Sequence, residues 1–224
     1  VRIALGALAG VLCERVAVTN LALEGMLLAG AFAGVPMGSL IGDWGGIVVM
    51  GSIVPMHDGS LLAFFHDDGR YFAAGGRAEG TFRLFQVRSR DGGRTWGTPR
   101  EIWRGSKEHL CEPGAIRSPD GRTVALMLRE NRRQAPSQVI FTTDEGRSWS
   151  PPRALAPELT GDRHTAKYAR DGRLVVTFRD MARESQPHGD WIAWVGRYED
   201  LAQGGPGQYR VRLMDNTYRD DCAY

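Results

Sequence analysis

Arginines and carboxylates stand at the ends of several apolar runs, where a fold could gather them into one site. Arg129 follows Leu128, and Arg179 follows Phe178, each at the end of such a run. A planar guanidinium binds a carboxylate through two parallel hydrogen bonds, so arginines in these places suit an anionic ligand. The alternative is that residues 129–133, Arg-Glu-Asn-Arg-Arg, form a solvated loop with local ion pairs. The residue types alone leave both interpretations open.

The composition argues against several other kinds of function. The formal net charge is +2, from 28 basic and 26 acidic side chains, and neither a basic helix nor a zinc finger is evident. We therefore expect no nucleic-acid partner. The three cysteines are too far apart for a disulfide framework or a metal site, and the histidines lack metal-ligand spacing, so we expect no metal and no cofactor. Cys111 is expected to be a small buried residue rather than a nucleophile.

Two octapeptides with one shared pattern are the strongest signal for the elements that position these side chains. Residues 89–96 (SRDGGRTW) and 142–149 (TTDEGRSW) both read hydroxyl-x-Asp-x-Gly-x-hydroxyl-Trp. A short turn with Asp and Gly joins two strands as a hairpin, because Gly adopts positive φ and the Asp side chain bonds nearby backbone amides. We expect the Trp ring to pack beneath its own turn and to lock the hairpin.

Three Asp-Gly turns alternate with the octapeptides and reveal a repeat. The turns at residues 58–59, 120–121 and 171–172 each precede a short apolar run, and they recur after 62 and then 51 residues (58 to 120 to 171). This period suits the four-stranded blades of a β-propeller, which run roughly 40 to 50 residues. The third repeat, Trp191 to Leu213, keeps the strands but lacks the octapeptide. We therefore predict an all-β propeller over residues 43–224, without a helix of useful length after residue 41.

Residues 1–42 form a different, apolar segment that we expect to be helical. Residues 3–41 contain only three charged side chains, yet no stretch reaches the ~20 uninterrupted apolar residues of a membrane span. Residues 3–36 resemble a fragment of the permease subunits of ATP-driven sugar and nucleoside importers, through Glu14-Arg15, Asn20 and Glu24-Gly25-Met26. We interpret the segment as a leader or anchor fragment without chemistry, which could contact a membrane through residues 3–41.

The octapeptides resemble the Asp-box of sialidases (neuraminidases) and related β-propellers, where it marks the fold rather than the site. In sialidases a Glu starts one strand, an Asp-Gly turn follows, and the return strand ends in an Arg. Residues 112–129 (EPGAIRSPDGRTVALMLR) match this order. The resemblance implies that Glu112 polarises a catalytic Tyr, and that Arg129 is one of three arginines that grip the carboxylate of the substrate.

The resemblance also implies a nucleophile and further arginines. The catalytic Tyr of the family opens a strand in a later blade, and Tyr224 falls at that place, after Asp221-Cys222-Ala223. Sialidases are glycosidases with a Tyr nucleophile, which a neighbouring base activates. For the third Arg we expect Arg163, which opens a strand, with Arg179 as the alternative.

The general acid of the family is an Asp in a loop of the first blade, and the candidates here are Asp68 and Asp67. An equally good interpretation is that Asp68-Gly69 forms another hairpin turn. Sialidases carry Arg-Ile-Pro where this chain has Ile-Val-Pro at residues 53–55, so the first carboxylate-binding Arg is absent there. Arg70 could replace it; otherwise the protein recognises a different sugar, or no acid at all.

The resemblance predicts a sialidase-like exo-α-glycoside hydrolase that releases a terminal acidic sugar from glycans. The alternative is a non-catalytic propeller of the same family that binds glycans or proteins. Residues 43–224 hold about three blades where sialidases close a ring of six. Because open blades leave strand edges unpaired, we expect a truncated fragment that is inactive and poorly stable by itself. For the family, a secreted or periplasmic location is expected.

Overall fold

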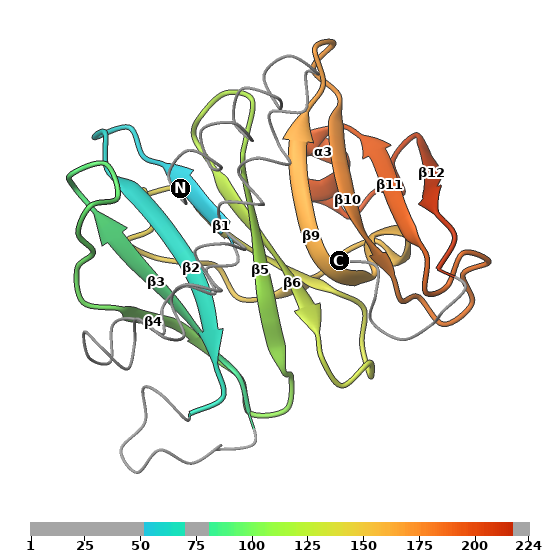
Figure 1. The fold of residues 1–224 in the computed structure, drawn as a ribbon, viewed down its shortest axis with the longest axis horizontal. Helices are drawn as coiled ribbons and strands as arrows, with labels where there is room; N and C mark the ends of the chain where they lie inside the picture. Colours follow the sequence, from blue (N-terminus) through green and yellow to red (C-terminus); the bar gives the residue numbers. More distant parts are fainter. Residues whose placement is uncertain (1–51, 70–80, 217–224) are drawn as a thin grey trace, which may run out of the picture. The chain divides into compact units, whose positions relative to one another are not determined.

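The computed structural model describes residues 52–69 and 81–216, which form three four-stranded antiparallel sheets (Figure 1). We call these sheets the first, second and third blade. The first blade contains β1 (Ser52–Pro55), β2 (Leu61–Asp67), β3 (Arg83–Ser89) and β4 (Arg100–Arg104). The second contains β5 (Leu110–Arg117), β6 (Val124–Glu130), β7 (Gln138–Thr142) and β8 (Arg153–Ala154). The third contains β9 (Gly161–Tyr168), β10 (Leu174–Asp180), β11 (Trp191–Gly196) and β12 (Tyr209–Met214).

Each blade is a meander in which every strand pairs with the next one along the chain. Strand β5 contacts both β1 and β9, so the first strands of the three blades are neighbours. The second strands β2, β6 and β10 run in the same direction, and their C-terminal residues therefore lie at one end of the blades (Figure 1). This arrangement confirms the expected all-β fold, a partial β-propeller with about three blades.

Strand β6 shows why the middle blade needs an uninterrupted apolar run. Its residues Val124, Leu126 and Leu128 pack into a core shared with the first blade. Ala125 and Met127 alternate with them and pack into a second core, shared with the third blade. Because successive side chains of a strand point to opposite faces, a strand that lies between two blades needs apolar side chains on both faces along the part that packs into the two cores.

The three Asp-Gly turns have one geometry. Their glycines, Gly59, Gly121 and Gly172, have φ between 77° and 82°. In each turn a carboxylate oxygen of the Asp accepts a hydrogen bond from the backbone N–H two residues later, at 3.0–3.1 Å. A side chain with a Cβ is disfavoured at such φ, so Gly permits the turn that the Asp side chain stabilises. The repeat found in the sequence therefore corresponds to the blades.

The two octapeptides share one hydrogen-bond network, and each joins the third strand of its blade to the fourth. In the first, Asp91 accepts hydrogen bonds from Thr95, at 2.9 Å from the backbone N–H and at 2.6 Å from the hydroxyl. In the second, Asp144 accepts the same two bonds from Ser148 at the same distances. The Asp side chain thus closes the loop in which it lies.

The tryptophans of the two octapeptides differ in what they contact. Trp149 packs edge-on against Phe64, with 5.4 Å between the ring centroids, and its indole N–H donates to Gln86 Oε1 at 2.8 Å. Both partners belong to the first blade, so the Trp149 ring also joins its own turn to the neighbouring blade. Trp96 is half-buried and lies close to Gly93 of its own turn.

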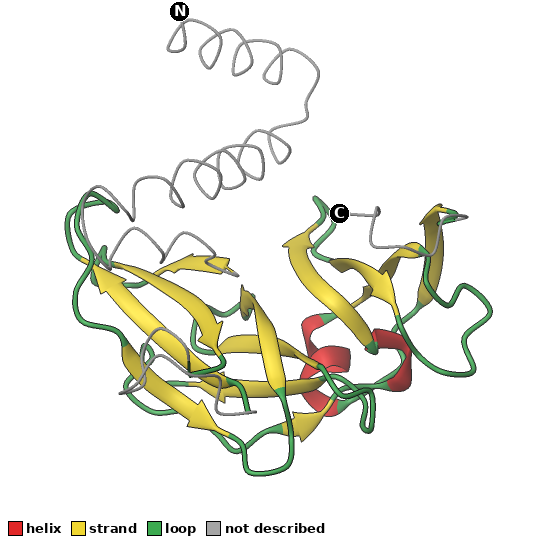
Figure 2. Cartoon of the chain, turned by 60° about the horizontal axis from the view of Figure 1, so that its bottom comes forward, coloured by secondary structure: helices red, strands yellow, loops and turns green. Residues whose placement is uncertain are grey.

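In the third blade a short helix replaces the missing octapeptide (Figure 2). Helix α3 (Tyr198–Gln203) connects β11 to β12, and a 3-10 turn, η2 (Pro157–Leu159), precedes β9. The Asp200 carboxylate accepts the backbone N–H of Arg197 at 2.7 Å, and Gly204 ends the helix with a φ of 79°. The sequence pattern does not predict this six-residue helix. Its Asp200 accepts a hydrogen bond from the backbone of the same connection, as the Asp of each octapeptide does in its own turn.

Several sequence-based predictions concern residues outside the described ranges. They are the apolar segment 1–42 with its permease resemblance, the boundary between residues 42 and 43, and the site candidates Arg70 and Tyr224. These stay predictions. Within residues 52–69 and 81–216, no helix has the length and apolar character needed to cross a bilayer.

Candidate functional site

The polar residues of the candidate site occupy equivalent positions in the three blades. The last two residues of the second strands are His66-Asp67 in β2, Arg129-Glu130 in β6 and Arg179-Asp180 in β10. The final carboxylate is at most 4% exposed in each blade. It accepts a backbone N–H from the loop that follows, namely Gly69, Gln134 and Ala182 in turn. The final carboxylates therefore fix the backbone of the loops that follow, while the residues before them lie close to the first strands of the blades.

Two of the first strands are bulged at this end. In β5 the register with β6 shifts between Cys111 and Gly114. In the third blade the register of β10 with β9 shifts between Thr177 and Arg179, which lie opposite Thr165 and Asp162 of β9. Glu112 and Arg163 lie in these bulges with φ of 50° and 55°, in the left-handed region that non-glycine residues seldom adopt. A bulge re-aims the side chains that it carries, and such strained positions are frequent in functional sites.

Glu112 is the carboxylate at which the predicted site residues meet. Arg129 Nη1 donates to Glu112 Oε1 at 2.7 Å, and the backbone N–H of Arg163 donates to Oε2 at 3.1 Å. The Arg163 guanidinium Nε lies 3.9 Å from Oε1. The Glu112 and Arg129 side chains are 19% and 18% exposed, so their ion pair is partly shielded from water. The structure thus brings Glu112, Arg129 and Arg163 together.

A second carboxylate, Asp162, holds three arginines. Its side chain is completely buried at the start of β9. Arg133 donates to both of its oxygens, at 2.5 and 2.7 Å. Arg129 Nε lies 3.2 Å from Oδ1, and Arg179 Nη2 donates to Oδ2 at 3.0 Å. Because Arg129 and Arg133 belong to the second blade and Asp162 to the third, this network joins the two blades.

The charged groups of the site shift one another's pKa values. Burial has the largest effect on Asp162 and would raise its pKa, but the three arginines together outweigh burial and lower it. Burial would likewise lower the pKa of Arg129, whereas Glu112 and Asp162 raise it overall. Burial lowers the pKa of His66, against the attraction of Glu112. Asp162 and Arg129 are therefore charged at neutral pH, and the His66 imidazole is neutral.

Asp67 and Asp68, the two candidates for the general acid, lie at the end of β2. Asp67 is buried, and its Oδ2 accepts the backbone N–H of Gly69 at 2.9 Å. Asp68 is half-buried, and Gly69 has a φ of 98°. The chain therefore does turn at Asp68-Gly69, and Asp68 is the more accessible of the two carboxylates.

Cys111 and His164 are buried beside the site and are poorly suited to chemistry. Burial raises the pKa of the Cys111 thiol to about 12, so it carries almost no thiolate at neutral pH. His164 Nε2 bonds with the carbonyl oxygen of Leu159 at 2.7 Å, and its ring stacks on Phe178. Within the described ranges, no group of three His, Cys, Asp or Glu side chains is arranged to hold a metal ion.

Asp162 and the contact that Arg133 makes with it are the parts of the site that sequence reasoning missed. Asp162 pairs in register with Arg179 in the third blade, and Cys111 pairs in register with Arg129 in the second. The second blade therefore has a thiol at the position where the third blade has a carboxylate, so the repeat in the sequence does not predict Asp162. Arg133 is half-buried against Asp162 and is not the solvated loop residue of the alternative interpretation.

Comparison with known proteins identifies the fold. No family model matches the chain, and no curated protein matches its sequence. Among solved structures, the chain is similar to a protein of unknown function from Dyadobacter fermentans, with a TM-score of 0.55, 17% sequence identity, and coverage of 73% of this chain and 41% of that one. This similarity shows the fold.

Two further solved structures are similar at lower TM-scores. The Hadza microbial sialidase Hz136 has a TM-score of 0.46 and 20% identity, with 73% of this chain and 32% of that chain covered. The catalytic domain of the Coprinopsis cinerea GH62 α-L-arabinofuranosidase has a TM-score of 0.49 and 10% identity, with 76% and 53% covered. The chain thus spans less than half the length of the first two proteins. No comparison supports the permease resemblance of residues 3–36.

Proposed function

We propose that this protein is a sialidase-like glycoside hydrolase that acts on a terminal acidic sugar of a glycan. The observation that carries the proposal is the arginine cluster at the Glu112 end of the blades. Four arginines, Arg129, Arg133, Arg163 and Arg179, share two carboxylates there, Glu112 and Asp162. A guanidinium offers the carboxylate of an acidic sugar two parallel hydrogen bonds, so a cluster of this kind suits such a ligand.

Within this proposal, Glu112 is the base that polarises the nucleophile, and Tyr224 is the nucleophile, as the family resemblance implies. Arg129 binds the carboxylate of the sugar. We now favour Arg179 over Arg163 as its companion, because Arg179 occupies in β10 the position that Arg129 occupies in β6. The Arg163 side chain is 52% exposed, whereas that of Arg179 is 10% exposed, and a buried guanidinium is better fixed for recognition.

For the general acid we favour Asp68 over Asp67. The carboxylate of Asp67 is buried and holds the backbone of its own turn, as Glu130 and Asp180 do in the other blades. A proton donor must reach the glycosidic oxygen, which suits the half-buried Asp68. In the proposal Arg70 remains the candidate for the Arg that is missing at residues 53–55.

One observation favours the alternative, a non-catalytic propeller that binds glycans or proteins. In β2 the position equivalent to Arg129 is His66, and its Nδ1 accepts the backbone N–H of Glu112 at 3.3 Å. The imidazole is neutral near pH 7, so the first blade adds no charge at the place where the other two blades each carry an arginine. A site with this composition could bind an acidic sugar without cleaving it.

The deciding experiment is an assay of the full protein on fluorogenic α-sialosides and on a fluorogenic β-glucuronide. We expect hydrolysis of a sialoside, a loss of about 10²-fold or more in kcat for Glu112→Gln, and a similar loss for Tyr224→Phe. Glu108→Gln, an exposed Glu near the start of β5, is the matched control and should keep full activity.

The other outcomes separate the two functions. Saturable binding of a sialoside without turnover, weakened in Arg129→Ala, would replace the hydrolase by the binding propeller. Cleavage of the glucuronide alone would keep the hydrolase and change the sugar. If the protein neither cleaves nor binds any acidic sugar, both functions are refuted.

A further inference from the structure

A second cluster of arginines lies at the opposite end of the blades from Glu112. It surrounds a cavity of about 490 Å³ between the first blade and the second octapeptide. The charged residues that line it are Asp58, Arg88, Arg90, Arg100, Glu145 and Arg147. The proposed hydrolase makes no use of this cavity.

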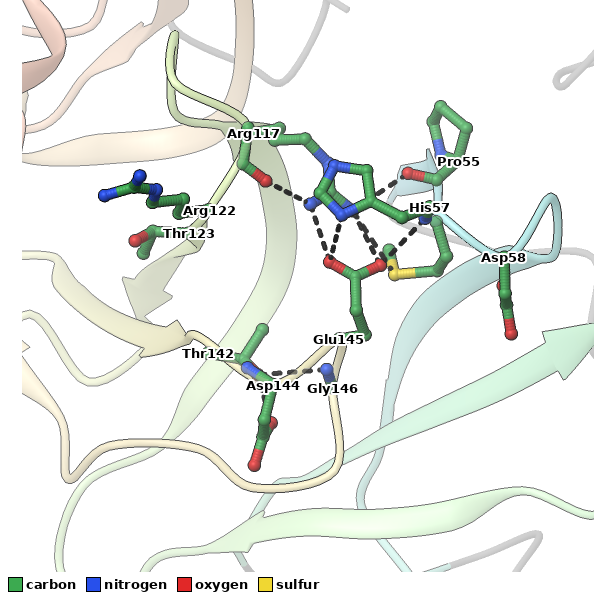
Figure 3. A network of polar contacts seen from close by, with 12 residues as sticks. Pro55, His57, Asp58, Arg117, Arg122, Thr123, Thr142, Asp144, Glu145 and Gly146 are labelled. Carbon is green, nitrogen blue, oxygen red and sulfur yellow. Dashed lines mark hydrogen bonds and ion pairs between the residues drawn. The ribbon is translucent and has the colours of Figure 1, made fainter.

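The carboxylate of Glu145 is already neutralised from outside the cavity (Figure 3). Arg117 donates to both of its oxygens, at 2.8 and 3.2 Å, and the backbone N–H of His57 donates to it at 3.0 Å. Glu145 has a φ of 60°, at the octapeptide position where the first octapeptide has Gly92. A non-glycine residue at this φ is strained, and here its carboxylate joins the second octapeptide to the first blade.

Two of the arginines are held in place by neutral groups. Arg88 donates to the Ser60 hydroxyl at 2.5 Å and to the carbonyl oxygen of Glu145 at 2.6 Å. Arg100 donates to the carbonyl oxygen of Arg147 at 2.9 Å and to that of Gly146. Neutral acceptors orient a guanidinium without compensating its charge, and of these two arginines only Arg88 also has a carboxylate nearby within the described ranges, that of Asp58 at 3.7 Å. These two arginines are therefore preorganised for an anion.

The charge balance of the cavity is strongly positive. Its four arginines, with Arg117, face only the carboxylates of Asp58 and Glu145, so five positive charges meet two negative ones, a difference of +3. Asp58 lies 3.7 Å from Arg88 and 3.6 Å from Arg90, and it is 51% exposed, so solvent weakens its effect. In the part of the chain that the structure describes, no carboxylate pairs with Arg100 or Arg147.

We propose that this cavity binds a tetrahedral oxyanion, a sulfate or a phosphate, either free or as an ester on a glycan. Such an anion has several acceptor oxygens for converging N–H donors and negative charge to offset part of the excess of +3.

The test is calorimetric titration of the full chain with sodium sulfate at constant ionic strength. We expect saturable binding, weakened about tenfold or more in Arg147→Ala and in Arg100→Ala, because each loses a charge-assisted hydrogen bond. Arg147 is the safer variant, since its exposed side chain makes no hydrogen bond or ion pair in the described structure. The matched control is Arg94→Ala, because Arg94 is exposed at the same position of the first octapeptide and does not line the cavity.

A second series separates the two sources of the oxyanion. A sulfated disaccharide and its unsulfated counterpart are titrated beside the inorganic ion. Binding of the sulfated sugar at least as tightly as sulfate identifies an ester site, and binding of the inorganic ion alone identifies a site for the free ion. An equal loss in Arg94→Ala and Arg147→Ala, or the absence of saturable binding in both series, would refute the proposal.

Discussion

The two ends of the blades use arginines and carboxylates in different ways. At one end Glu112 and Asp162 pair with arginines from other strands, and Asp162 joins the second and third blades. At the other end Asp91 and Asp144 bond with the hydroxyl and the backbone of their own turns. The comparison shows that a carboxylate in a local motif builds a hairpin, whereas a carboxylate at a bulged strand start collects charge from neighbouring strands.

The largest effect is expected for Asp162→Asn, which tests the network that joins two blades. The variant leaves Arg129, Arg133 and Arg179 buried to varying degrees without their shared carboxylate, and breaking a buried ion pair from one side costs about 3–5 kcal/mol. The free energy of unfolding, measured with denaturant, should fall by about 3 kcal/mol or more.

The control for this experiment is Asp171→Asn in the third Asp-Gly turn, whose exposed carboxylate pairs with Arg173. We expect it to change the free energy of unfolding far less than Asp162→Asn does, because solvent screens an exposed ion pair. Equal losses in the two variants would remove the distinction between the network across blades and the local turn.

An intermediate effect is expected for Trp149→Ala, which sharpens the comparison within the octapeptides. The variant removes the contact with Phe64 and the hydrogen bond to Gln86, both in the first blade. Replacing a fully buried Trp by Ala lowers the free energy of unfolding by about 3–5 kcal/mol, so we expect a loss of about 2 kcal/mol for this half-buried ring. The matched variant Trp96→Ala should cost about half as much, because Trp96 lies against its own turn. Thermal unfolding compares the two, and a larger loss for Trp96 would contradict the assignment.

The smallest effect is expected for Asp91→Asn, and it should depend on pH. The hydrogen bond from the Thr95 hydroxyl, followed by that from the Thr95 backbone, lowers the pKa of Asp91 to about 2 from a usual value of 3.8. A group whose pKa falls on folding stabilises the folded state above its unfolded pKa, and this contribution is lost as the pH falls through the folded pKa. The melting temperatures of the two proteins should therefore differ above about pH 4 and converge near pH 2. A constant difference across this range would show that the charged carboxylate is not the group that the turn stabilises.

The sequence predicts the blades well because their signals are local. Each Asp-Gly turn is stabilised between residues two apart, and each octapeptide between residues four apart, so the same residues produce the same geometry wherever the motif occurs. The six-residue helix α3 escapes prediction because it is too short to show the apolar periodicity of a helix. The sequence shows where strand-end residues such as Glu112 and Arg129 lie along the chain, but it does not show which side chains they contact.

The all-β repeat, the Asp-Gly turns and the polar residues at the strand ends can be read from the amino-acid sequence alone. Two features became visible only in the folded structure: Asp162 holds three arginines, and Trp149 contacts Phe64 and Gln86 of the preceding blade. The physical reason is the range of the interactions. Turn hydrogen bonds join near neighbours in the chain, whereas the Asp162 network and the contacts of Trp149 join residues that meet only when the blades pack together.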